Sequence, residues 1–236
     1  MLFRSPVAAP KNSWVDPDAP RADPAVRQGT LPNGLRYVVM SNSRPAKGLS
    51  IRLRFEVGSY DERDDERGAA HFLEHMAFNG TRHIPEGRID TVFGTQGVRF
   101  GRDQNASTGL FETRYELDMP QVDKAKLDLA FQWLRDVGDG VNLEPNAIQR
   151  ERGVVKAEDD RTKGPERAWW ESVEKWMSPE LRSTQRSPIG TPESIASMDQ
   201  ARLRGFYERW YRPDNAIIVA VGELAADELE QRVKEI

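Results

Sequence analysis

Two of the three histidines in this 236-residue chain, His71 and His75, stand four residues apart in the stretch HFLEH. Residues 68–79 have the composition of a helix, and Gly80 follows as a stop signal. On a helix, side chains four positions apart project from one face, one turn above each other. The spacing therefore predicts two imidazoles that can reach a single metal ion.

Glu74 lies inside the same stretch, three residues after His71 and next to His75. A catalytic zinc ion takes three protein ligands and leaves one position for water, whose pKa it lowers. An adjacent carboxylate can take the proton of that water and pass it to a leaving amine. The stretch thus offers two ligands and a general base, Glu74, while a third ligand has to come from elsewhere.

A second helix, opened by Pro145, carries two candidate acids. Glu151 and Glu158 are seven residues apart, which is two turns along one face. The valines between them, Val154 and Val155, are expected to pack inward. One acid can bind the metal while the other orients a histidine or a substrate group. On spacing alone, two solvated helix acids are an equally good interpretation.

Apolar patterns predict several short β-strands in the first half of the chain and one further strand near its end. These strands are expected at residues 36–40, 49–57, 105–108, 113–117 and 215–221. Helices are expected at residues 68–79, 86–94, 123–137, 145–158 and 201–210, with further helices from Pro165 and Ala226. This order predicts an α+β fold in which helices pack on one face of a mainly antiparallel sheet.

The prolines indicate how the chain is divided. Five of the 15 fall in the first 26 residues, which predicts an extended, poorly packed leader over residues 1–26. One metal-binding domain is expected over residues 27–236. The chain starts without a secretory signal and stops inside a helical pattern, and we interpret it as a fragment of a longer polypeptide.

Composition excludes several classes of protein. The net charge is -4, with 34 basic and 38 acidic residues interleaved, so a nucleic-acid binder is not expected. No stretch approaches the roughly 20 apolar residues of a membrane span. The absence of cysteine removes thiol catalysis and cysteine metal sites, and it leaves the redox compartment open.

Other features have simpler interpretations. The charged stretch 61–67 is expected to be a solvated loop that leads acids into a helix N-terminus. Trp169, Trp170 and Trp176 are expected in the core, because aromatic residues at helical spacing usually pack there rather than form a ligand platform. His83 is expected at the surface, past the end of the histidine helix.

Several longer motifs occur along the chain. They are LPNGL at 31–35, GAAHFLEHMAFNGT at 68–81, NAST at 105–108 with Thr113 and Tyr115, residues 151–158, PIGT at 188–191 and FYERWYRPDN at 206–215. In this order they resemble the motifs of the pitrilysin/insulinase family of zinc peptidases, which includes mitochondrial processing peptidases and bacterial periplasmic members. The resemblance runs from about Gly29 to the end of the chain, and HxxEH is the inverzincin signature.

The resemblance implies a role for each residue of the histidine and acid motifs. His71, His75 and Glu158 match the family's zinc ligands, and the cofactor is Zn2+. Glu74 matches the general base. Glu151 matches the acid that supports the site from the same helix as the third ligand.

The resemblance also implies a place for the substrate. Asn105, Ala106, Ser107 and Thr108 match the edge strand on which the family binds an extended peptide as an added β-strand. This role has a physical basis, because an exposed edge offers unpaired backbone groups. A plain meander strand is the alternative.

Family members build four related domains in two halves around a closed chamber, and this chain matches only the first domain. We therefore expect a zinc-dependent endopeptidase domain that binds zinc but has little or no activity alone. Its expected partners are a peptide substrate and either the C-terminal half of the same enzyme or a homologous partner subunit. The similarity to long bacterial members favours the periplasm over the cytoplasm.

Two alternatives remain open. The chain could be a non-catalytic structural or substrate-binding subunit of a two-chain peptidase, although such subunits usually have a broken HxxEH motif. It could instead hold a purely structural zinc ion, which would require four protein ligands and no open position.

Overall fold

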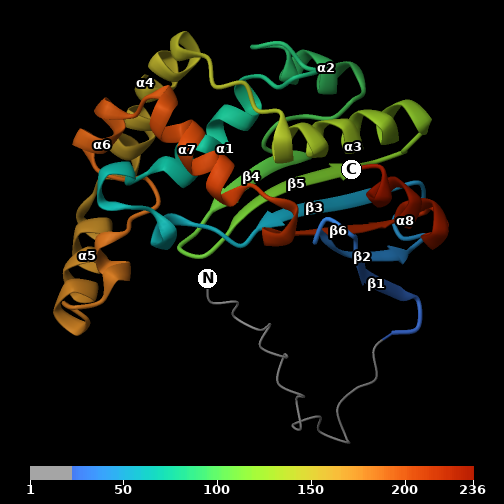
Figure 1. The fold of residues 1–236 in the computed structure, drawn as a ribbon, viewed down its shortest axis with the longest axis horizontal. Coiled ribbons are helices and arrows are strands. Elements are labelled where there is room, and N and C mark those ends of the chain that lie inside the picture. The colour runs from blue at the N-terminus through green and yellow to red at the C-terminus, as the bar shows by residue number, and fades with distance from the viewer. Residues whose placement is uncertain (1–22) are drawn as a thin grey trace, which may run out of the picture.

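A six-stranded sheet is the centre of the computed structural model, which describes residues 23–236 (Figure 1). In chain order the strands are β1 (Val26–Thr30), β2 (Arg36–Ser41), β3 (Leu49–Phe55), β4 (Gln104–Thr108), β5 (Thr113–Met119) and β6 (Ala216–Gly222). They lie in the order β1-β2-β6-β3-β5-β4. Most of the leader expected over residues 1–26 lies outside the described residues, and Val26 already belongs to β1.

A strand from the far end of the chain completes the sheet. β6 lies between β2 and β3, parallel to β2 and antiparallel to β3. The other neighbouring strands are all antiparallel. The apolar run of β6 suits a central strand, since both of its edges are paired. The expected α+β fold with a mainly antiparallel sheet is confirmed.

The sheet has one covered face and one open face, as the alternation along β3 shows. Every second residue from Leu49 to Phe55 is buried, and the residues between them are half-buried. On the open face, charges pair across strands, and Arg52 Nη2 lies 2.8 Å from Asp118 Oδ2. The two-residue period of a strand thus separates the core from the solvent.

Helices cover the other face, although not all of them reach the sheet. The helices of the described residues are α1 (Ala69–Asn79), α2 (Ile89–Thr95), α3 (Lys124–Asp139), α4 (Pro145–Thr162), α5 (Pro165–Met177), α6 (Pro192–Ser197), α7 (Gln200–Trp210) and α8 (Ala226–Lys234). Figure 1 shows α1, α3 and α7 on one side of the sheet, and α8 packs on β2. Within residues 23–236, no helix has both the length and the apolar character needed to cross a membrane.

Trp133 of α3 joins three elements in the core. Its side chain is fully buried. The centroids of Phe78 in α1 and Phe93 in α2 lie 5.5 Å and 5.7 Å from its own. Tyr115 of β5 packs edge-on at 6.2 Å. Large aromatic contacts of this kind hold α1 in place over the sheet.

The charged stretch 61–67 is only in part the solvated loop that its composition predicted. Residues 63–65 are exposed, but Glu62 and Glu66 are buried. Glu66 Oε2 lies 3.2 Å from Arg63 Nη2, and Glu66 also pairs with Arg209 of α7. The prediction was wrong for these two glutamates because a buried carboxylate needs partners, and the partner from α7 is distant in sequence.

Glu62 and two glycines fix the start of α1. Glu62 accepts hydrogen bonds from the backbone N–H groups of Gly68 at 2.8 Å and Ala70 at 2.9 Å. It thereby satisfies two of the amides that a helix leaves free at its N-terminus. Gly68 has a φ of 85°, and a Cβ on Gly190 would stand 3.0 Å from the Gly68 Cα. Glycine at both positions allows this close approach.

α5 does not join the core, contrary to the expectation from its tryptophans. Trp169, Trp170 and Trp176 are 57%, 53% and 82% exposed, and no residue of α5 is buried. The spacing correctly indicated an amphipathic helix. It could not indicate whether another element of the same chain covers the apolar side.

The buried Glu62 gives a pH-dependent prediction. Burial raises the pKa of Glu62 to about 8, although its backbone hydrogen bonds favour the charged form. Between its ordinary pKa, about 4.3, and this value, the folded chain holds a proton that the unfolded chain has released. Rising pH therefore favours unfolding in this window. We expect the free energy of unfolding of the wild type to fall relative to that of Glu62→Gln as the pH rises.

Urea denaturation of both proteins at several pH values between about 5 and 8 measures this difference. A difference between the two proteins that does not change with pH would contradict the prediction.

Candidate metal centre

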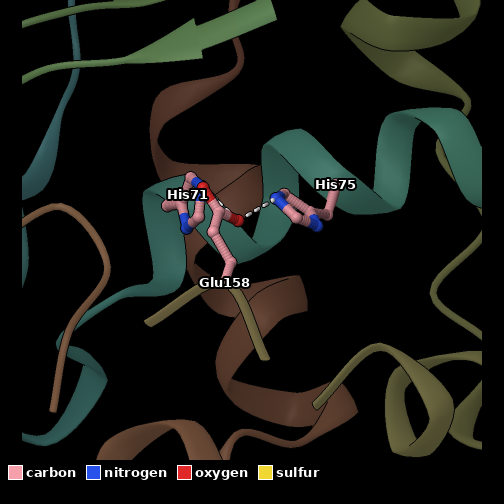
Figure 2. Close-up of side chains that lie close together, drawn as sticks. All are labelled: His71, His75 and Glu158. Atoms are coloured by element: carbon pink, nitrogen blue, oxygen red, sulfur yellow. Dashed lines mark ion pairs between the residues drawn. The ribbon is translucent and has the colours of Figure 1, made fainter. Parts of the chain in front are cut away.

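α1 and α4 pack against each other and bring three potential metal ligands together (Figure 2). His75 Nε2 lies 3.3 Å from Glu158 Oε2, and His71 Nε2 lies 3.6 Å from the same oxygen. The ligand atoms of the three residues are all within 4.8 Å of one another. The fold thus joins the histidine pair of α1 with one of the two acids of α4.

The spacing of these atoms suits a small tetrahedral ion. Bonds of about 2.0–2.1 Å place the ligand atoms of a tetrahedral zinc site about 3.4 Å apart. The separations of 3.3 Å and 3.6 Å to Glu158 Oε2 are close to this value. Among the described residues the group contains two imidazoles and one carboxylate, one donor fewer than a closed structural site.

Glu151 lies behind His75 and orients it. Glu151 Oε1 is 2.7 Å from His75 Nδ1, and Glu151 Oε2 accepts a hydrogen bond from Asn79 Nδ2 at 2.7 Å. Because both oxygens are engaged, the carboxylate fixes the imidazole and leaves its Nε2 directed at Glu158. The two acids of α4 therefore occupy different places, one among the potential ligands and one beside them.

The two histidines have opposite pKa shifts. Burial, together with the nearby His75, lowers the pKa of His71 to about 4. Burial also disfavours the charged form of His75, but the hydrogen bond and charge of Glu151 outweigh it and keep the pKa of His75 above its usual range. Metals bind the neutral imidazole. His71 is therefore in its binding form at neutral pH, whereas a metal at His75 competes with a proton.

Glu74 is a buried carboxyl beside the ligand group. Thr108 at the end of β4 donates a hydrogen bond from Oγ1 to Glu74 Oε2. Burial raises the pKa of Glu74, and the hydrogen bond from Thr108 opposes this shift. A carboxyl group with a raised pKa can both accept a proton and return it near neutral pH.

These groups open into a cleft of about 450 Å3. His71, Glu74 and Glu158 line it together with residues 106–108 of β4 and residues 187–189. A larger cavity of about 720 Å3 lies elsewhere, between α3 and α8, and none of these residues lines it. The smaller cleft is therefore the one that could place a substrate next to the potential ligands.

β4 presents a free edge beside this cleft. It is the last strand in the sheet order, so one of its edges has no partner strand within the described residues. The N–H of Ala106 donates to the side-chain Oδ1 of Asn105 at 2.9 Å, which indicates that this donor points away from β5. Asn105 and Ser107 are exposed, while Ala106 and Thr108 are half-buried. A free edge of this kind can accept an added strand.

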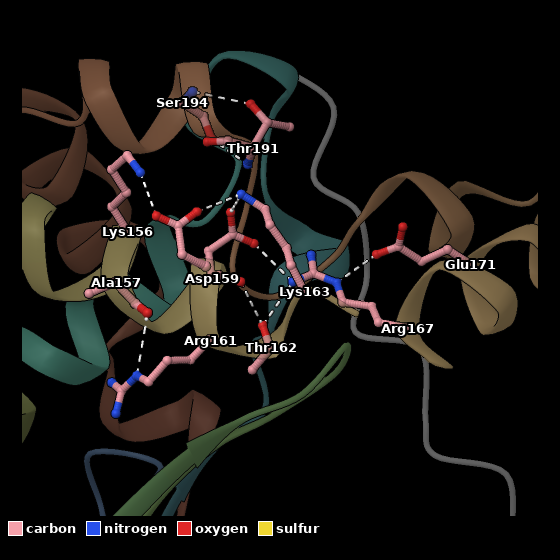
Figure 3. A network of polar contacts seen from close by, with 11 residues as sticks. Lys156, Ala157, Asp159, Arg161, Thr162, Lys163, Arg167, Glu171, Thr191 and Ser194 are labelled. Atoms are coloured by element: carbon pink, nitrogen blue, oxygen red, sulfur yellow. Dashed lines mark hydrogen bonds and ion pairs between the residues drawn. The ribbon is translucent and has the colours of Figure 1, made fainter. Parts of the chain in front are cut away.

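A charged network holds the end of α4 next to Glu158 (Figure 3). Asp159 is buried and lies 2.7 Å from Lys163 Nζ and 2.9 Å from Arg167 Nη1. Arg167 Nε also lies 2.7 Å from Glu171 of α5. Arg167 thus connects α4 to α5, and it lines the cleft as well.

The two valines of α4 that were expected to pack inward differ in burial. Val154 does not pack inward, since it is 48% exposed, whereas Val155 is buried. The face of α4 that meets α1 therefore contains Val155 and Glu151 but not Val154.

His83 is a surface residue, as expected, and pairs with the buried Asp136 at 2.7 Å rather than with the metal group.

Sequence reasoning missed two parts of the site. Asn79, which holds Glu151, stands one turn after His75, and this spacing could have identified it. Residues 187–189 reach the cleft because Gly190 packs on Gly68. That contact joins distant parts of the chain, and no local pattern encodes it.

Two family models match the chain. Residues 37–174 match the model described as Insulinase (Peptidase family M16), and residues 197–236 match the model described as Peptidase M16 inactive domain. The second stretch contains α7 and β6, and β6 lies between two strands of the first. Both matched stretches therefore contribute to one sheet.

Individual proteins are similar over most of the chain. A protein of Haemophilus influenzae named "Probable zinc protease PqqL" is 35% identical over 213 residues, which are 90% of this chain and 23% of that protein. The crystal structure of the periplasmic protease PqqL from Escherichia coli superposes with a TM-score of 0.86 at 32% identity and covers 90% of this chain and 24% of that one.

The ferredoxin protease FusC, solved as a mutant in complex with Arabidopsis ferredoxin, has a TM-score of 0.83 at 30% identity. The match covers 89% of this chain and 23% of that one. The 236 residues thus span about a quarter of the length of these proteins.

The ligand group gives a prediction about thermal stability. If a divalent ion such as Zn2+ binds only the folded chain, it should stabilise that state by about 2.7 kcal/mol at 100 times its Kd. We expect Zn2+ to raise the unfolding temperature of the wild type and of His83→Ala, but not that of His71→Ala. Differential scanning fluorimetry with and without EDTA measures this.

His83→Ala is the matched control because it removes the third histidine, which lies outside the group. An equal shift in all three proteins would contradict the assignment.

Proposed function

Because the chain belongs to the insulinase family of peptidases, family M16, we propose that it forms the metal-bearing part of a zinc metallopeptidase. One observation carries the proposal. His71, His75 and Glu158 converge on one point, and the buried carboxyl of Glu74 stands beside them in an open cleft. The similar proteins from Haemophilus influenzae and Escherichia coli are named as proteases.

In this proposal His71, His75 and Glu158 hold the zinc ion. The donor types and their spacing fit it, and Glu151 keeps the His75 imidazole in the binding orientation. When bound, zinc would polarise the carbonyl of a peptide bond and lower the pKa of a nearby water molecule. Three protein donors leave a side of the ion free for the substrate.

Glu74 is the proposed general base and acid. It would accept a proton from the attacking water and return it to the leaving amine. Its position supports both steps, because the carboxyl lines the cleft on the same helix as the two histidines. The hydrogen bond from Thr108 Oγ1 to Oε2 holds its orientation and leaves Oε1 for the reacting groups.

Residues 105–108 of β4 are the proposed substrate-binding strand. An extended peptide that pairs with the free edge of β4 would run along the cleft past Glu74. Thr108 belongs to this strand and bonds to Glu74, so the same strand would align the peptide and the base. This arrangement suits an endopeptidase that cleaves unfolded or extended segments.

The complete enzyme is proposed to contain more than this chain. Residues 27–236 would form its N-terminal metal-binding domain, and the rest would come from the same polypeptide or a homologous partner subunit. The length of the similar proteases supports this, since the chain covers about a quarter of each. We propose that the isolated chain binds zinc without efficient proteolysis. The periplasm is the proposed compartment of the enzyme, because the similar Escherichia coli PqqL is a periplasmic protease.

The catalytic role predicts the effect of changing Glu74. In the whole protein, Glu74→Gln should lower kcat for peptide hydrolysis by about 100-fold to 10,000-fold, because general acid–base catalysis contributes about this much. Zinc content should stay the same, since the ligand group is intact. Metal analysis and a fluorogenic peptide assay on the same preparations separate the two effects.

Asp136→Asn, which changes another buried acid that does not line the cleft, is the control. Full turnover by Glu74→Gln would exclude this residue as the base. Loss of zinc by Glu74→Gln would show that it belongs to the ligand set.

The proposed pairing of a peptide with β4 predicts the effect of removing one backbone N–H from the free edge of this strand. Ala106→Pro deletes an N–H that β5 does not use, and proline is tolerated on edge strands. We expect the folded protein to bind an inhibitory peptide with a Kd raised about 5-fold to 10-fold, which corresponds to one hydrogen bond. Isothermal titration with Glu74→Gln in the background measures the Kd.

Ala106→Gly is the control variant, because it keeps the N–H while changing the side chain. An unchanged Kd for Ala106→Pro would mean that the peptide does not pair with β4.

A further inference from the structure

α5 is an amphipathic helix whose apolar side has no cover among the described residues. Apolar residues recur along it at spacings of three and four, which places them on one side. Apart from the half-buried Val173, their exposed fractions range from 53% to 82%. We define the α5 apolar face by its residues, which are Trp169, Trp170, Val173, Trp176 and Met177, with Leu181 just beyond the helix.

The polar side of α5 is the side turned toward its own domain. Arg167, Glu171, Glu174 and Lys175 line a cavity that residues 183–188 also line. A helix that covers its own domain has the opposite orientation, with apolar residues inward. Packing among residues 23–236 therefore does not explain why the apolar side of α5 faces outward.

α5 is also held firmly in this orientation. Arg167 in its first turn lies 2.9 Å from the buried Asp159 of α4, and its Nη1 donates to Thr162 Oγ1 at 2.8 Å (Figure 3). Glu171 of α5 binds the same guanidinium at 2.7 Å and holds it in place. Arg167 thus attaches the polar side of α5 to α4, and the apolar face points outward.

We propose that the α5 apolar face is the docking surface for a folded domain of the same protein that lies outside these 236 residues. An exposed apolar patch rich in tryptophan marks a protein interaction site. The face is one side of a projecting helix (Figure 1), and the cavity and cleft beside α5 are lined by polar residues of the helix. A helix of this kind fits a groove in a folded partner, whereas an extended peptide needs a groove to lie in.

Two observations indicate which partner covers the α5 apolar face. The similar proteases are about four times as long as this chain, so such proteins carry further polypeptide that can supply a partner domain. The rim of the face is acidic, because Glu166 and Glu180 lie beside it and form no ion pair within residues 23–236. We therefore expect an apolar groove with a basic rim. This inference rests on the part of the proposed function that assigns further domains to the protein.

Hydrogen–deuterium exchange tests the docking surface without requiring zinc or activity. It compares the 236-residue chain with the whole protein expressed from its complete gene. We expect peptides covering residues 165–181 to exchange at least about tenfold more slowly in the whole protein. Equal exchange in the two proteins would overturn the proposal. Slow exchange in the isolated chain, with a dimeric mass in light scattering, would also overturn it, because a second copy would then be the occupant.

A substitution in the face provides a second test. Trp176→Lys should leave the melting temperature of the 236-residue chain nearly unchanged, since this side chain is 82% exposed there. In the whole protein the same change should accelerate exchange over residues 165–181. Phe100→Lys is the control, because Phe100 is another exposed aromatic residue, at 55%, and lies before β4 rather than on α5.

Equal effects of Trp176→Lys in the two proteins would contradict the inference. Zinc content, measured on the same samples, reports separately on the proposed function. The exchange data can therefore contradict the docking proposal while the zinc content supports the metal site, and the reverse is equally possible.

Discussion

The packing of α4 against α1 is the contact on which the rest of the site depends. The histidine pair is local to α1, but Glu158 comes from a helix far along the chain and must arrive within about one ligand spacing of both Nε2 atoms. Glu151 strengthens the contact, because it binds His75 and Asn79 of α1 from the same side of α4. The site is therefore a property of the helix pair, and the sheet and Trp133 hold α1 in place.

The buried polar groups around this contact are connected to one another. Glu62 binds the first amides of α1, and the Gly68–Gly190 contact brings residues 187–189 to the cleft. Thr108 connects β4 to Glu74. The strand proposed to bind substrate, the proposed base Glu74 and the helix that carries the histidines are thus linked by direct contacts. Preorganisation of this kind allows a catalytic group to act without rearranging at each turnover.

Much of the site could be predicted from sequence because its signals are local. The four-residue spacing of His71 and His75 and the alternation in β3 follow from the period of one helix or strand. Spacing alone left Glu151 and Glu158 equivalent, and only the arrangement of α4 on α1 separates them. The burial of Glu62 and the exposure of the α5 tryptophans were predicted wrongly. Both depend on which distant element, or which other domain, covers a side chain.

X-ray absorption at the zinc K-edge of the purified chain, combined with its metal content, tests whether His71, His75 and Glu158 bind zinc together. We expect one zinc ion per chain with two imidazole nitrogens and carboxylate oxygen at about 2.0–2.2 Å. We also expect the imidazole signal to be halved in His75→Ala and unchanged in His83→Ala. A folded chain that binds no zinc, or a first coordination sphere with three imidazoles, would contradict the assignment of His71, His75 and Glu158.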